Sequence, residues 1–247
     1  MNHLYYPTVK LILKGTPEEL ASPNAKKVVL IATKANLPIV CETVTAEECK
    51  QLSSHWEKSL VLLVGGGGKD EDDEEEEATI SVATSRAMMR TIASMANPAI
   101  GLLGTSVVDE AMIDGWLAFI WTSIEIPLQA ALALEEKRSD TATAAAAEEK
   151  AGIETDLEIA LKKVETHLLK LKSSCCCRDE NNNNHHPVYN MVTTTAKSYT
   201  LADFSLAVTL RYMLDNNIAT SVMTSDENPQ LYKWYQTIIQ NKALDLQ

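Results

Sequence analysis

The amino-acid sequence predicts a protein of two parts, a small α/β domain over residues 1–97 and an all-helical domain over residues 107–247. Short, apolar, β-branched runs alternate with helical patterns in the first hundred residues, whereas only helical periodicity continues after Val107. The change of character follows the segment NPAIGLLGTS. A chain of 247 residues, 45% of them hydrophobic, is long enough to build both cores.

The first domain is expected to have the element order β-α-β, an unassigned connection, and then β-β-α. The first helix is predicted because Val28, Ile31, Ala32 and Ala35 recur at three- and four-residue spacing. The segment GTPEELASPN before it is expected to be a loop, since it contains two prolines. The predicted strands cover residues 8–14, 38–44, 59–64 and 78–83, and the predicted helices cover residues 25–36 and 84–95.

An acidic insert over residues 65–77 separates the third and fourth predicted strands. It begins with four glycines, and Lys69 to Glu77 then contribute −7 of the formal net charge of −12. Glycines resist ordering and like charges repel, so we expect a solvated insertion at a hairpin tip. A tolerated low-complexity insertion is the main interpretation, and an acidic tail for a basic partner is the alternative.

The second domain is predicted from its helical periodicity. A long helix starts at Asp109 and should kink or break at Pro127, because proline lacks the backbone N–H. Residues 140–152 are alanine-rich and weakly specified, whereas residues 156–171 carry leucine and valine at alternating four- and three-residue spacing. A low-complexity loop over residues 172–187 follows, and two further helices are expected over residues 201–214 and 228–241.

The stretch SYTLADFSLAV contains a strong helix start. Thr200 can cap the helix that follows, while the Asp203 carboxylate reaches back to the Thr200 N–H, which is the pattern of a capping box. Tyr199 and Phe204 stand at the two positions of a hydrophobic staple. The sequence therefore predicts a structural cap formed by Thr200 and Asp203.

Composition excludes several functional classes. An acidic chain without a basic stripe argues against direct binding of nucleic acid. No apolar run approaches the roughly 20 residues of a membrane helix, so no membrane association is predicted. Five cysteines, three of them consecutive, do not make a disulfide framework, which favours a reducing cytoplasm. Cys41 on a predicted strand is expected to be a buried thiol, and His167 on the polar side of its helix a solvated surface residue.

Other candidate sites carry little signal. The run from Cys175 to Cys177 and the pair His185 and His186 lack the two-to-four-residue ligand spacing of structural zinc sites, so no metal site is predicted. The glycine run at 65–68 is not followed by the lysine and serine or threonine of a phosphate loop.

These segments together resemble the glutathione transferase family. The resemblance covers nearly the whole chain and is carried by SPNAKKVVLIATKANLPIVCE from Ser22, ATSRAMMRTIAS from Ala83, TLADFSLA from Thr200 and NPQLYKWYQTI from Asn228. It implies an N-terminal thioredoxin-like βαβ-ββα domain followed by a glutathione transferase C-terminal-like helical bundle. It also implies dimers formed through the faces that the family uses.

The resemblance implies a glutathione site that this sequence keeps only in part. Ser22 is the candidate thiolate-stabilising hydroxyl, with Thr16 and Tyr6 as competitors. Ser85 matches the serine that holds the γ-glutamyl group, but Thr84 stands where the family has an acid. The family's cis-proline before the third strand is missing from HWEKSLVLLV, and a cis bond without proline costs about 3 kcal/mol. We therefore expect no cofactor.

The resemblance then gives two functional hypotheses. Family members that lost the site include the gamma subunit of elongation factor one and modules associated with aminoacyl-tRNA synthetases, so the first is a non-catalytic protein–protein interaction module of the translation machinery. The second is a glutathione transferase with a divergent site at Ser22, Asn24, Thr84 and Ser85. Lys233 replaces the arginine of the family's second interface and is the interface candidate, whereas Trp234 is expected in the core. A redox role is disfavoured, because the first helix lacks a Cys-x-x-Cys motif.

Overall fold

The computed structural model describes residues 10–52, 60–65, 79–138, 144–174, 191–192, 198–224 and 226–240. The chain divides into two compact units, the first ending at Ile100 and the second beginning at Gly101. The first is a mixed α/β unit and the second is helical, which confirms the predicted fold class. Each unit is described by itself.

The first unit is built on a four-stranded mixed sheet in the order β2-β1-β3-β4. β1 pairs in parallel with β2 and antiparallel with β3, and β4 continues antiparallel at the edge. In this register Leu13 lies opposite both Cys41 and Leu62. The strands are β1 (Lys10–Gly15), β2 (Ile39–Thr43), β3 (Leu60–Gly65) and β4 (Thr79–Val82).

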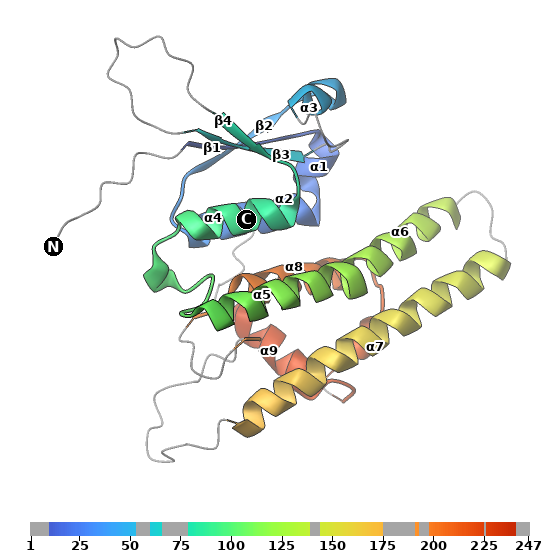
Figure 1. Ribbon diagram of the computed structural model, residues 1–247. Coiled ribbons are helices and arrows are strands. Elements are labelled where there is room, and N and C mark those ends of the chain that lie inside the picture. The colour runs from blue at the N-terminus through green and yellow to red at the C-terminus, as the bar shows by residue number, and fades with distance from the viewer. Residues whose placement is uncertain are drawn as a thin grey trace, which may run out of the picture. The chain divides into compact units, whose positions relative to one another are not determined.

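Helices cover both faces of this sheet (Figure 1). The helices α2 (Pro23–Lys34) and α4 (Ser85–Met95) pack together on one face, and α3 (Ala46–Leu52) contacts β1 and β3 on the other. The core between the sheet and α2 and α4 contains the fully buried Leu13, Leu62, Val28, Ile31, Met88 and Ile92. Val28 and Ile31 in this core are among the positions whose spacing predicted α2.

Two short helices in the first unit were not predicted. The segment expected to be a loop contains α1 (Pro17–Ala21), which starts with proline at its first turn and is capped by Thr16. The unassigned connection contains α3, where Glu48 accepts hydrogen bonds from both the N–H and the hydroxyl of Thr45, each at 2.8 Å. Both helices are too short for a hydrophobic period to repeat, so hydrogen bonds at their first turns define them instead.

The second unit consists of helices around α8, whose first ten residues are all buried. A short 3₁₀ helix, Pro98–Ile100, precedes the unit boundary, and another, Thr220–Val222, follows α8. Figure 1 shows α7 as a single long helix. The α-helices are α5 (Val107–Ile120), α6 (Ile126–Arg138), α7 (Ala144–Ser174), α8 (Leu201–Asp215) and α9 (Pro229–Gln240).

The long helix does not break at Pro127, where a kink or a break was expected. A π-helical turn, Trp121–Glu125, joins α5 to α6, and Pro127 lies in the first turn of α6. The wide turn adds a residue ahead of the proline, which relieves the clash between its ring and the preceding turn. The weakly specified residues 144–152 also belong to α7, because a 31-residue helix gains its stability from packing over its whole length.

The expectation that no segment reaches membrane length is corrected for residues 107–136. Within the described residues, this is the one helical stretch long and apolar enough to cross a membrane, with a mean hydropathy of 1.5 over 18 residues. A core helix of a helical bundle passes the same test of length and composition. Its buried side chains, including Ile113, Leu117, Ile120 and Ile124, belong to the core of the second unit.

Candidate functional site

Ser22 lies between two helices and caps both of them. Its backbone N–H closes α1 on the Glu19 carbonyl, and its side chain is the N-cap of α2. The Ser22 hydroxyl donates to the Glu19 carbonyl oxygen at 2.6 Å and accepts the Ala25 N–H at 3.3 Å. This hydroxyl therefore both donates to and accepts from the backbone of neighbouring residues. A thiolate at this position would have to displace the Glu19 carbonyl to receive the proton.

The other hydroxyls considered for this role have local structural partners or lie outside the described residues. Thr16 caps α1 by accepting the Glu19 N–H at 3.3 Å, and Tyr6 lies outside the described part of the chain. Asn24 is half-buried in the first turn of α2. The structure therefore places Ser22 and Asn24 at the same helix start, where the N-terminal backbone dipole favours negative charge.

Thr84 and Ser85 form the start of α4. Thr84 is the N-cap, and its hydroxyl accepts the Ala87 N–H at 3.3 Å, while the half-buried Ser85 is the first residue of the helix. The threonine hydroxyl caps the helix, as an acid at this position also could, but it carries no negative charge. An ammonium group at this position, such as that of a γ-glutamyl residue, would gain no ion pair from Thr84.

Neither described cysteine has the environment of a reactive thiol. Cys41 is exposed on β2, contrary to the expectation of a buried thiol, because β2 lies at the sheet edge. Partial burial still raises the pKa of Cys41. Cys49 is fully buried in α3, and burial raises its pKa, with further contributions from the charges of Glu19 and Glu48. Raised pKa values keep both thiols protonated at neutral pH.

The described residues contain no cis peptide bond and no cluster of three or more metal-binding side chains. The segment directly before β3, residues 53–59, lies outside the described residues, as does most of the acidic insert, residues 66–77. The cysteine and histidine run considered for zinc, residues 175–186, also lies outside them.

Asp203 holds together the start of α8. Its carboxylate accepts the N–H and the hydroxyl of Thr200, at 2.8 and 2.6 Å. It also accepts the Met191 N–H at 2.7 Å and the Trp234 indole N–H at 3.3 Å. The structure thus contains the capping box and extends it to α9, with Trp234 in the core as expected.

Burial dominates the protonation of Asp203. The side chain is fully buried, and the loss of hydration raises its pKa to about 6, although all four hydrogen bonds oppose that shift.

Glu165 is a second buried carboxylate, which sequence analysis missed. It extends from α7 and accepts the N–H groups of Gln230 and Leu231, at 3.2 and 2.7 Å, at the start of α9. Lys233, the interface candidate, is exposed on α9.

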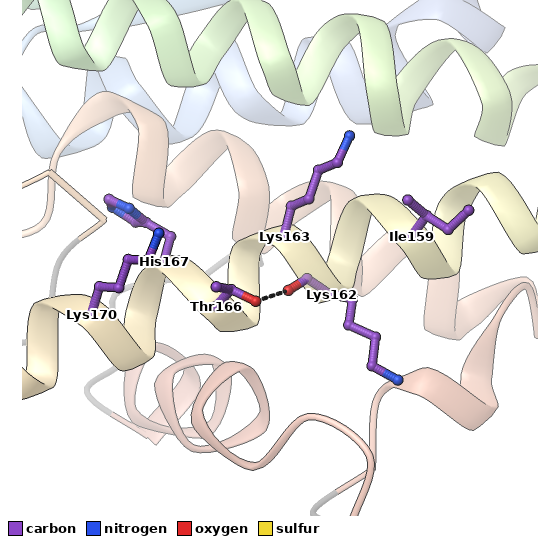
Figure 2. A pocket seen from close by; sticks show the side chains of 6 residues that line it. All are labelled: Ile159, Lys162, Lys163, Thr166, His167 and Lys170. Atoms are coloured by element: carbon purple, nitrogen blue, oxygen red, sulfur yellow. Dashed lines mark hydrogen bonds between the residues drawn. The ribbon is translucent and has the colours of Figure 1, made fainter.

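A cavity of about 520 Å³ lies along one side of α7 (Figure 2). His167 lies at this cavity and is half-buried rather than fully solvated, which corrects the prediction. Its Nε2 is 2.7 Å from the Met191 carbonyl oxygen, and its ring lies 4.5 Å from that of Trp116. Burial lowers the pKa of His167. The residues that line the cavity are Ile159, Lys162, Lys163, Thr166, His167 and Lys170.

Comparison with known proteins identifies the fold. No protein-family model and no curated protein sequence matches the chain. Solved structures do match over nearly the full length of both chains. Glutathione transferase F2 from Populus trichocarpa is 16% identical with a TM-score of 0.65, covering 95% of each chain. Ure2p, solved in complex with glutathione, is 16% identical with a TM-score of 0.70, covering 96% of this chain and 92% of Ure2p.

A third similar structure, FzlA from C. crescentus, is 16% identical with a TM-score of 0.65 and covers 95% of this chain and 90% of its own. All three alignments span the α/β unit and the helical unit together. The chain therefore has the glutathione transferase fold.

Proposed function

We propose that this chain is a non-catalytic protein–protein interaction module of the translation machinery. It would act as a scaffold similar to the gamma subunit of elongation factor one or to modules associated with aminoacyl-tRNA synthetases. The observation that supports a loss of catalysis is the hydrogen bonding of the Ser22 side chain. Its hydroxyl donates to the Glu19 carbonyl oxygen at 2.6 Å and accepts the Ala25 N–H. The candidate thiolate stabiliser therefore caps the end of α1 and the start of α2.

Two further observations support a degenerate glutathione site. Thr84 supplies a neutral cap where an acid would bind the γ-glutamyl ammonium group. The sequence before β3 contains no proline, so a cis peptide there would cost about 3 kcal/mol. Loss of both features removes the charge recognition and the backbone geometry that a tripeptide ligand needs.

Protein surfaces would then carry the function. Trp234 and Leu231 are buried on α9 while Lys233 is exposed, so α9 presents a cation next to a rigid core. Lysine offers a point charge rather than the planar fork of arginine, so it would bind a single carboxylate of a partner. We propose a homodimer or heterodimer in the cytoplasm, without direct contact to nucleic acid or membrane.

The alternative is a glutathione-dependent enzyme with a divergent site. Ser22 and Asn24 at the start of α2 favour it, because the end of a helix can stabilise a thiolate. The similarity to Ure2p, which binds glutathione in its solved structure, also favours it. In that case Ser22 would rotate away from Glu19, and Ser85 would hold the γ-glutamyl group.

Calorimetric titration with glutathione at millimolar concentration separates the two functions. The native chain and the Ser85→Ala variant should give no saturable heat. The matched control is Ser94→Ala, which removes an exposed hydroxyl from the same helix. Saturable binding that is lost in Ser85→Ala and kept in Ser94→Ala would overturn the proposal in favour of the enzyme.

A binding experiment then tests the translation role. Immobilised chain should retain purified elongation-factor or aminoacyl-tRNA synthetase subunits at fixed stoichiometry. Lys233→Glu should weaken that retention, whereas Lys26→Glu on α2 changes the net charge equally and should not. Retention of none of these subunits would contradict the translation role, whatever the outcome with glutathione.

A further inference from the structure

The cavity on α7 is lined by cations in an acidic protein. Lys162, Lys163 and Lys170 lie with Thr166 on one side of the helix, because residues three, four and seven positions apart share a face. Among the described residues, the cavity lining includes no carboxylate, although the whole chain carries a formal charge of −12. The local field therefore attracts anions that the rest of the molecule repels.

The shape of this surface fits an extended chain. Lys162 and Lys170 are eight residues apart, which is about 12 Å along a helix. An extended peptide covers this distance with about four residues, and its alternate side chains lie about 6.6 Å apart on one face. Ile159, which is 51% exposed, supplies an apolar contact at one end.

We propose that this face of α7 docks an acidic peptide segment of a partner protein. The inference rests on the proposed function in one respect, namely that the chain has a protein partner. The lysine ammonium groups would bind two or three carboxylates, and the Thr166 hydroxyl oxygen would accept a peptide N–H. That hydroxyl already donates its proton to the Lys162 carbonyl at 2.8 Å, so it has acceptor capacity only (Figure 2).

The three lysines of this surface are exposed. Lys162 lies 3.9 Å from Glu227, and both side chains are more than 60% exposed, so this ion pair is weak and exchangeable. His167 also lines the cavity and is half-buried. Burial lowers its pKa first, and the charge of Lys170 lowers it further, while the bond to Met191 opposes these effects.

A nucleic acid is the competing polyanion, and the surface fits it less well. Sequence-independent binding of a single strand combines a long cationic groove with aromatic side chains on which bases stack. The three lysines here span about 12 Å, and His167, the only aromatic ring among the described residues that line the cavity, already packs on Trp116. Acidic peptides need neither a long track nor a stacking surface.

Fluorescence anisotropy of the full chain with a labelled ten-residue peptide of alternating glutamate and serine tests the proposal. The variant K162Q/K163Q/K170Q should bind this peptide about tenfold more weakly than the native chain, since each exposed ion pair is worth roughly a factor of two to three. The control K10Q/K26Q/K172Q removes the same charge from exposed positions outside the cavity and should retain native affinity.

Each other outcome overturns the proposal. Absence of peptide binding at millimolar concentration would do so, as would equal weakening in both triple variants. Tighter binding of a uridine decamer than of the peptide would assign the surface to nucleic acid. Sedimentation equilibrium tests the remaining possible occupant of the surface, a second copy of this chain. Self-association that requires both the three lysines and the acids at 70–77 would assign the surface to a second copy of this chain. Because glutathione plays no part, failure here is distinguishable from failure of the proposed loss of catalysis.

Discussion

Two aspartates at the starts of α5 and α8 make similar local bonds in very different surroundings. Asp109 accepts the N–H and the hydroxyl of Thr105, both at 3.0 Å, and Asp203 accepts the same two groups of Thr200. Asp109 lies near the surface, and hydrogen bonding, first of all from the Thr105 backbone, lowers its pKa. Asp203 is fully buried, and burial raises its pKa despite two additional donors.

The difference teaches that a hydrogen-bonded threonine–aspartate pair, used here as a motif of helix starts, does not by itself define the role of the aspartate. At Asp109 the motif orders one turn of an exposed helix start. At Asp203 it also binds Met191 and the indole of Trp234, and so ties α8 to α9. Removal of a buried acceptor leaves its donors without partners, whereas water replaces an exposed one.

Replacement of Asp203 should have the largest effect. Asp203→Ala leaves four buried donors unsatisfied, so we expect the free energy of unfolding to fall by about 3–5 kcal/mol. Asp109→Ala should cost about 1 kcal/mol, as for an ordinary exposed hydrogen-bonded side chain. Urea unfolding followed by tryptophan fluorescence measures both. Equal losses in the two variants would contradict the role of burial.

The two aspartates should also respond to pH with opposite sign. Between the ordinary value near 3.8 and about 6, the folded protein binds a proton at Asp203 that the unfolded chain does not bind. The contribution of Asp203 to stability therefore rises as pH falls through this window, by up to about 1.4 kcal/mol per pH unit. The lowered pKa of Asp109 makes its contribution fall only below its ordinary value.

Urea unfolding at several pH values between 4 and 7.5, with Asp203→Asn and Asp109→Asn as references, checks this prediction. The stability of the native chain relative to Asp203→Asn should increase as the pH falls from about 6 to 4. The difference relative to Asp109→Asn should stay constant over the same range. A constant difference for Asp203→Asn would show that its carboxyl stays ionised in the folded protein.

Glu165 should have an intermediate effect. Glu165→Ala removes the carboxylate that caps α9 from α7, which we expect to cost about 2 kcal/mol. Hydrogen exchange at the Leu231 amide should increase more than at amides inside α8. Glu158→Ala, an exposed change on the same helix, is the control. It should leave the free energy of unfolding within about 0.5 kcal/mol of the native chain and the exchange rate of the Leu231 amide unchanged.

Ser22 should have the smallest effect. Ser22→Ala removes the cap of α2 and should cost about 1 kcal/mol, visible as faster hydrogen exchange at the Ala25 amide. Ser22→Asp retains a capping acceptor and should restore protection of that amide. A loss of glutathione binding in Ser22→Ala would instead show that the hydroxyl serves a ligand.

Much of the fold could be predicted from local sequence signals. The four strands and the helices α2, α4, α8 and α9 follow from apolar spacing and from caps, which act over three or four residues. The short helices α1 and α3 could not be predicted from periodicity, because they contain fewer than two full periods. The π-turn before Pro127 could not be predicted either, since packing decides whether a helix continues past a proline.

The candidate sites divide in the same way. The sequence by itself determined the cap of α8, formed by Thr200 and Asp203, because a cap and its partner lie a few positions apart. Tertiary structure alone decided that Glu165 caps α9, 65 residues away from Gln230, and that His167 packs on Trp116. Burial and long-range partners depend on how helices distant in sequence meet, and local spacing contains no information about that meeting.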